Sequence, residues 1–188
     1  PFANLDGALR QEMGDEVRSI LKAQGAAAVL VSHDRSEAVG LADRIGVLDR
    51  PREHAAYEMI QTGSPESVYT SPASQEVARL TGTAYFIRAQ ATGLTAHTAI
   101  GTISLSKPMD GDAMLVVRPE QVIFESDAEG QSLLEDIKYM APGYRIIINT
   151  PAGRIMGFST SALDPSLRTG HTKIIGVCHP LPAAEVRK

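Results

Sequence analysis

The sequence is poor in the residues that mark several protein classes. It has no tryptophan and one cysteine, Cys178, so no disulfide framework can form within the chain. Its longest aliphatic run, residues 26–31, is far shorter than the roughly 20 residues of a membrane-spanning helix. Charged residues make up 21% and hydrophobic residues 43% of the chain, which is typical of a globular protein. We therefore expect a globular protein with no membrane-inserted segment, and Cys178 as a small buried side chain.

The chain also lacks an excess of positive charge. Its formal net charge is −4, and no block of five like charges occurs. Residues 83–188 carry ten basic and ten acidic side chains, so this part is close to neutral. Proteins that bind nucleic acids usually present a basic face to the phosphates. We therefore expect no nucleic-acid partner.

The first part of the chain alternates between helical and apolar segments. Apolar residues at helical spacing predict a helix over residues 7–24, with Asp6 at its N-cap and Gly25 at its end. Residues 26–31 are typical of a strand that is buried on both faces of a parallel sheet. A helix over residues 35–43 and a strand over residues 44–48 follow. This alternation predicts an α/β layer.

The pattern continues after a polar loop at residues 50–56. Residues 57–61 are expected to form a strand. Ser64 is placed to cap a helix that has Pro65 in its first turn, and a further short helix is expected over residues 74–80. Gly82 ends this helix, and the sequence pattern changes there.

Beyond Gly82, short apolar or alternating runs are separated by turns that contain glycine, proline or acidic residues. Regular short strands with such turns predict an all-β barrel or sandwich. The expected strands are residues 84–90, 100–105, 113–118, 121–125, 133–139, 144–149, 154–158 and 173–177.

Three segments of the first part carry a specific pattern. Residues 1–10 read PFANLDGALR, residues 31–48 read VSHDRSEAVGLADRIGVL, and residues 60–73 read IQTGSPESVYTSPA. The first resembles the D-loop and following helix of ATP-binding cassette (ABC) ATPases, and the second resembles their H-loop, or switch, segment. The third is similar to the stretch that closes the cassette in importers. In the second part, Arg118-Pro119-Glu120 resembles the central motif of the OB-like TOBE domain that follows the cassette in many importers.

The resemblance implies a fold and a division into domains. Residues 1–82 would be the C-terminal part of the nucleotide-binding domain, a partial P-loop NTPase (RecA-like) α/β layer. Residues 83–188 would be an all-β, OB-like TOBE domain with a regulatory role. The chain would be a C-terminal fragment, starting at the D-loop, of the ATPase subunit of an importer for ferric iron, sulfate, polyamines or phosphonates. The sequence does not identify the solute.

The resemblance also implies roles for three residues. His33 matches the switch histidine, a catalytic residue that contacts the γ-phosphate, while Asn4 and Asp6 match D-loop residues beside the nucleotide. The full-length subunit would use ATP and Mg²⁺. The P-loop, signature and Walker B motifs are missing from residues 1–188. We therefore expect this polypeptide alone neither to hydrolyse ATP nor to bind it tightly, and no metal ligand is expected among its residues.

The expected partners are a second copy of the ATPase subunit and transmembrane permease subunits. The full-length subunit would be cytoplasmic and peripheral on the inner face of the cell membrane. Because the strand at residues 26–31 is apolar enough to need neighbours, we also expect residues 1–188 to self-associate. An alternative function is a regulatory module that binds oxyanions or a partner and stabilises the ATPase dimer. For Arg118 and Glu120, a structural pair at a strand end is favoured over an effector site.

Overall fold

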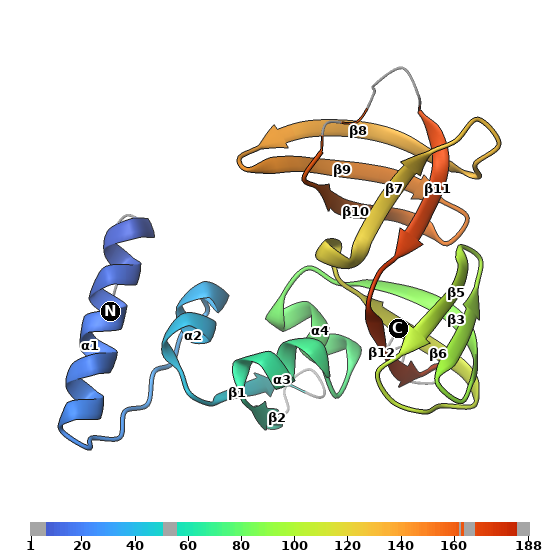
Figure 1. The fold of residues 1–188 in the computed structure, drawn as a ribbon. Helices are drawn as coiled ribbons and strands as arrows, with labels where there is room; N and C mark the ends of the chain where they lie inside the picture. Colours follow the sequence, from blue (N-terminus) through green and yellow to red (C-terminus); the bar gives the residue numbers. More distant parts are fainter. Residues whose placement is uncertain (1–6, 51–55, 162, 164–167, 184–188) are drawn as a thin grey trace. The chain divides into compact units, whose positions relative to one another are not determined.

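The computed structural model describes residues 7–50, 56–161, 163 and 168–183. The chain divides into two compact units, Pro1–Gly82 and Thr83–Lys188, which we call unit 1 and unit 2. Figure 1 shows that the α-helices lie in unit 1, whereas unit 2 is built from strands and one short 3-10 helix. No helix among the described residues is long and apolar enough to cross a bilayer.

Unit 1 begins with the helix α1 (Gly7–Ala23), close to the range predicted from its apolar spacing. The helix ends at Gly25, whose φ of 61° lies in the left-handed region that glycine adopts without strain. The Gly25 N–H donates to the Lys22 carbonyl, and the Ala26 N–H donates to the Leu21 carbonyl. These two bonds form a Schellman motif, so Gly25 acts as the helix stop that the sequence predicts.

The predicted strand at residues 26–31 is wrong. These residues have no regular structure and are exposed, with Val29 at 95% and Val31 at 87%. A strand of this composition needs hydrogen-bonded strands beside it and helices on its faces. The described part of the chain offers it neither, so the parallel α/β layer is not formed here.

The rest of unit 1 is a short hairpin with three small helices. The helix α2 (Arg35–Leu41) precedes β1 (Ile45–Asp49), which pairs antiparallel with β2 (Glu58–Gly63). The helices α3 (Pro65–Thr70) and α4 (Gln75–Thr81) follow. The strand predicted at residues 44–48 is therefore present as β1, but it pairs antiparallel with β2 and not with a parallel strand.

Serine caps fix the starts of α3 and α4. The Ser64 hydroxyl accepts from the Ser67 N–H at 3.2 Å, and the Ser74 hydroxyl accepts from the Val77 N–H at 3.3 Å. Serine is favoured at this position because its short side chain satisfies a backbone donor that has no partner within the helix. The cap at Ser64 confirms the prediction for that residue.

Unit 2 contains a closed five-stranded barrel and a second five-stranded sheet. Around the barrel the strand order is β12-β5-β4-β3-β6, and β12 closes it by pairing parallel with β5 and antiparallel with β6. The sequence analysis missed β4, which is only four residues long. The barrel strands are β3 (Tyr85–Thr92), β4 (Thr95–Thr98), β5 (Gly101–Leu105), β6 (Gly111–Val117) and β12 (Val177–Pro182).

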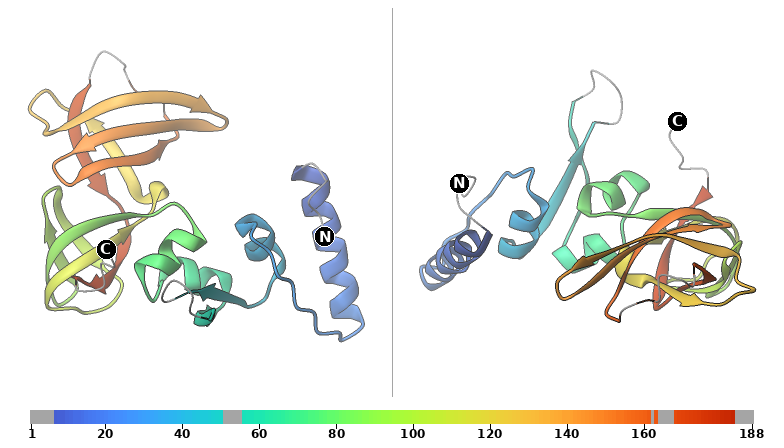
Figure 2. Two further views of the ribbon diagram at one scale, coloured as in Figure 1. Left: turned by 180° about the vertical axis from the view of Figure 1, so that it is seen from behind. Right: turned by 90° about the horizontal axis from the view of Figure 1, so that it is seen from above.

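The second sheet has the order β10-β9-β8-β11-β7. Both views in Figure 2, like Figure 1, show its long β8–β9 hairpin. The strand predicted at residues 173–177 is wrong, because it spans the end of β11, a turn with Gly176 at φ 75°, and the start of β12. The elements are η1 (Pro119–Gln121), β7 (Val122–Ser126), β8 (Ser132–Met140), β9 (Gly143–Thr150), β10 (Gly153–Ser159) and β11 (Thr169–Ile174).

A β-bulge at Glu135 sets the register of the β8–β9 hairpin. Leu134 pairs with Ile148 and Ile137 pairs with Ile146, so the register shifts by one residue between them. The extra residue lets two apolar side chains that are three positions apart reach the same face. Because of the bulge, the hairpin keeps its apolar face on the core.

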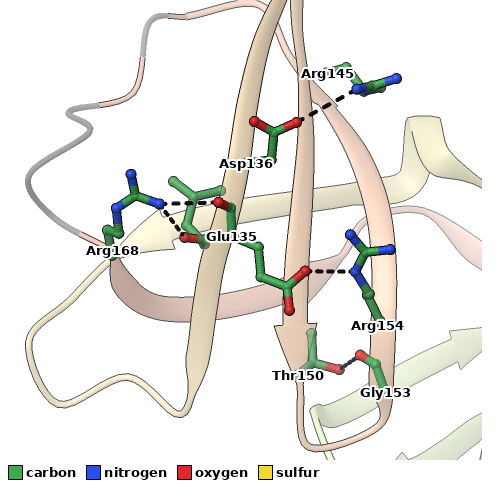
Figure 3. Close-up of polar contacts among 8 residues, drawn as sticks. Glu135, Asp136, Arg145, Thr150, Gly153, Arg154 and Arg168 are labelled. Carbon is green, nitrogen blue, oxygen red and sulfur yellow. Dashed lines mark hydrogen bonds and ion pairs between the residues drawn. The ribbon is translucent and has the colours of Figure 1, made fainter.

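Polar contacts surround this bulge (Figure 3). The Arg168 guanidinium donates to the carbonyls of Leu134 and Glu135 at 3.4 and 3.1 Å. The Glu135 carboxylate accepts from Arg154 at 2.6 Å, and Asp136 pairs with Arg145 at 3.6 Å. Each of these arginines therefore already has an acidic or backbone partner.

Candidate functional site

His33 lies in a bend directly before α2, and its side chain is exposed. Two neighbours fix the bend. The Ser32 hydroxyl accepts from the Asp34 N–H at 3.0 Å and donates to the Glu37 carboxylate. These bonds fix the backbone on both sides of His33, and the side chain of His33 is exposed to solvent.

Asp34 caps the helix that follows. Its carboxylate accepts from the Glu37 N–H at 3.3 Å, and its carbonyl accepts from the Ala38 N–H at 3.1 Å. An acidic N-cap with glutamate three residues later is a known helix-start pattern. The polar residues around His33 in the motif thus have a local structural role, whereas the imidazole makes no hydrogen bond or ion pair with another described residue.

This arrangement suits an imidazole that meets a ligand from outside. An exposed histidine can donate a hydrogen bond to a phosphate oxygen at neutral pH and can exchange a proton with water. Among residues 7–50 and 56–82, none covers His33, so the ring is open to such a ligand on the side of these residues. The two other predicted site residues, Asn4 and Asp6, lie outside the described residues.

The helix α2 is packed against α1 by a close contact and by charge. A Cβ on Gly14 of α1 would lie 2.4 Å from Cδ2 of Leu41, so a larger residue at this position would require the Leu41 side chain to shift. Asp43, just after α2, forms ion pairs with Arg18 and, at 3.7 Å, with Lys22 of α1. The hydrogen bond from Arg18 and the charges of Lys22 and Arg18 lower the pKa of the Asp43 carboxyl.

The sequence analysis missed the role of Asp43, although this residue belongs to the motif that contains His33. Acidic and basic residues on segments far apart in sequence give no periodic signal. The Asp43 pair with Arg18 joins the end of the motif that contains His33 to α1 across 25 positions. Because all of these side chains are substantially exposed, the pair orients α1 and α2 more than it stabilises them.

Arg118 has a structural place in unit 2. Its side chain is buried, with the residue only 4% exposed, and its Nη1 donates to the Thr83 carbonyl at 3.2 Å. Its backbone N–H donates to the Gln121 side-chain oxygen at 2.9 Å. A side chain so deeply buried does not face an incoming ligand. A structural role is therefore the better interpretation of Arg118 itself, whereas its pairing with Glu120 stays a prediction.

The remaining histidines do not form a common site. His97 contacts Thr102 at 3.1 Å, His171 pairs with Asp127 at 3.2 Å, and His179 contacts Ser106 at 3.2 Å. His54 lies outside the described residues. In the described ranges no group of three histidine, cysteine or acidic side chains is arranged to hold a metal ion.

Comparison with known proteins gives a consistent set of relatives. An Fe(3+) ions import ATP-binding protein of Rhodococcus jostii is 29% identical over 90% of this chain and 50% of its own length. A sulfate/thiosulfate import ATP-binding protein of Chromobacterium violaceum is 30% identical over 100% of this chain and 52% of its own length. The Fe(3+) ions import ATP-binding protein of Yersinia pestis is 34% identical over 65% of this chain. No family profile matches the sequence. The chain spans about half the length of the first two relatives.

Proposed function

This chain belongs to the ATP-binding subunits of ABC importers, and we propose that it provides the switch part of their ATPase site together with a regulatory β unit. Unit 1 would carry the switch loop, and unit 2 would be the TOBE-type OB-like domain. The observation that supports this most directly is His33, exposed at the apex of a bend that Ser32, Asp34 and Glu37 fix.

His33 would act on ATP from this bend. Its ring would donate a hydrogen bond to the γ-phosphate and help to hold the attacking water, while Asn4 and Asp6 would lie beside the nucleotide. Mg²⁺ neutralises charge on the phosphates when it is bound. The P-loop lysine and the Walker B acidic residues, which hold phosphate and metal in such enzymes, are not in this sequence. The residues present therefore fit the switch role and not nucleotide binding by themselves.

The assembly follows from the same proposal. Two ATPase subunits would form a homodimer that binds transmembrane permease subunits at the inner face of the cell membrane. The relatives import Fe(3+) ions or sulfate and thiosulfate, so an inorganic ion is the solute class that we propose.

A chimeric subunit tests the role of His33. The N-terminal half of the Chromobacterium violaceum relative is fused to residues 1–188, and steady-state release of phosphate from ATP is measured. We expect the chimera to hydrolyse ATP and His33→Ala to lower kcat by about 100-fold or more, the usual size of such a contribution. His97→Ala, which alters an exposed histidine of unit 2, serves as the control and should leave kcat unchanged. Full activity of the His33→Ala chimera would rule out the proposed role.

Residues 1–188 alone provide the second arm of this test. Without a P-loop, this polypeptide should release no phosphate from ATP above the buffer rate. Turnover by the purified polypeptide would contradict the proposal that the catalytic machinery lies mostly outside it.

Oxyanion binding by unit 2 is the weaker alternative. The outer face of β8–β10 carries Arg145 and Arg154, but Asp136 and Glu135 already neutralise them (Figure 3). An oxyanion would have to displace a carboxylate at 2.6 Å from Arg154. Calorimetry of residues 83–188 with molybdate, sulfate and phosphate distinguishes the two functions, and we expect no heat of binding.

A further inference from the structure

Three segments of unit 2 meet at one place: the start of the unit and the two connections between its barrel and its second sheet. The chain starts the unit at Thr83, leaves the barrel for the second sheet through η1 after β6, and returns to the barrel between β11 and β12. The Ile175 N–H donates to the Gln121 carbonyl at 2.8 Å. This bond joins the segment that leaves the barrel to the segment that returns to it. In Figure 1 the turn before β7 lies beside the segment that leads from β11 to β12.

The side chains of Arg118 and Gln121 connect these three segments. Gln121 accepts the Arg118 N–H at 2.9 Å through its oxygen and donates to the Val177 carbonyl at 2.9 Å through its nitrogen. Arg118 then reaches the Thr83 carbonyl through Nη1 at 3.2 Å. A continuous series of hydrogen bonds therefore runs from Thr83 to Val177, the first residue of β12.

The Arg118 side chain acts where regular pairing stops. The β3–β6 ladder ends with Tyr85 opposite Val117, the residue before Arg118. Thr83 lies beyond this last pair, and the guanidinium of Arg118 supplies a hydrogen bond there. Thr83 is also the residue that directly follows the boundary with unit 1.

We propose that Arg118 is a latch that fixes the start of unit 2 to the junction between its two sheets. A guanidinium is always charged and is costly to bury, and the bond from Nη1 to the Thr83 carbonyl offsets part of that cost. This bond therefore favours one defined path of the chain at the start of unit 2. This role does not depend on the proposed function of His33.

Hydrogen exchange in the complete 188-residue chain tests the latch. In Arg118→Met, which keeps a long side chain but has no donor, amides of residues 83–85 should exchange about ten- to a hundredfold faster, the range expected for a charge-assisted hydrogen bond. Amides in the middle of β3 and β6, at Ala89 and Leu115, should keep their exchange rates. Arg88→Met makes the same substitution at an exposed position of β3 and should change none of them.

A second variant covers the case in which Arg118→Met does not fold. Arg118→Lys keeps the charge and one donor head, so it should fold and show a smaller increase, again confined to residues 83–85. Unchanged exchange at residues 83–85 in the folded variants would overturn the latch. An equal increase throughout the barrel would overturn it as well, because Arg118 would then only stabilise the core.

Discussion

The two units differ in how much of their apolar surface they bury. In the described part of unit 2, a core cluster of sixteen buried residues draws on the barrel and on the second sheet. In the described part of unit 1 the core cluster is three residues, Val47, Val68 and Val77. Most of the apolar face of α1 is exposed, with Val17 at 38% and Ile20 at 49%.

The two units thus have similar apolar content but bury it to different extents, and we expect their stabilities to differ for this reason. Burial of apolar area is the main favourable contribution to folding, and it must exceed the loss of chain entropy. Unit 2 meets this requirement within its own residues. Unit 1 has apolar positions at helix and strand spacing but few partners for them in the described part of the chain, so its elements depend more on local features such as the caps and Gly25.

The largest expected effect is a difference in thermal unfolding between the two units when each is made as a separate polypeptide. Residues 83–188 should unfold in one cooperative thermal transition, because the buried core lies within them. Residues 1–82 should show no cooperative transition, since a two-stranded hairpin and short helices are marginal without a larger core. Calorimetry and circular dichroism of the two polypeptides measure this. A cooperative transition of residues 1–82 would contradict the comparison.

Two neighbouring leucines of β8 compare core and surface within unit 2. Leu134 is 1% exposed, whereas Leu133 is 45% exposed. Leu134→Ala should lower the free energy of unfolding by about 2–5 kcal/mol, as expected for a large-to-small substitution in a core. Leu133→Ala should change it by no more than about 0.5 kcal/mol. Urea titrations of both variants check the difference, and equal effects would mean that the described core does not control stability.

His179, a buried histidine of unit 2, should make the stability of this unit depend on pH. Burial, and then the charge of Lys107, lowers the pKa of His179 from 6.5 to about 4. The unfolded chain takes up this proton below about pH 6.5, whereas the folded chain does so only below about pH 4. Stability should therefore fall, by up to about 3 kcal/mol, as pH drops between these values.

Variants separate this contribution from general acid effects. His179→Asn should remove that part of the pH dependence, whereas His33→Asn, which changes an exposed ring in unit 1, should retain it. Unfolding in urea at pH 7 and pH 5 provides the measurement. An unaltered slope in His179→Asn would show that His179 is not the group responsible.

Local signals in the sequence predict where a helix begins or ends better than they predict which other elements pack against it. Gly25 and Ser64 act as the stop and the cap that their residue types indicate, because both roles depend on adjacent backbone. The exposed state of residues 26–31 depends on neighbours that a local pattern does not report. For the same reason the sequence places His33 in a motif but reveals neither the Asp43 contact with Arg18 nor the link from Arg118 to Thr83.

The bulge in β8 gives the smallest of the predicted effects. The spacing of Leu134 and Ile137, three rather than two, is a signal that the sequence analysis missed. Deleting Glu135 removes the extra residue and leaves Leu134, Asp136 and Ile137 alternating in, out and in, so the core register should survive. The loss of an Arg168 contact should lower the free energy of unfolding by about 1 kcal/mol, and the loss of the exposed Arg154 ion pair should add little.

Deleting Ile147 from the facing strand β9 is the matched control. This strand has no extra residue, so its removal turns Ile148, which is fully buried, toward the outer face. The cost should therefore exceed that of the Glu135 deletion and reach at least the roughly 2–5 kcal/mol of a lost core side chain. Urea unfolding of the two deletions measures the difference. If they are equally harmful, the bulge does not absorb the irregular spacing, and the packing of the β8–β9 hairpin must depend on Glu135 itself.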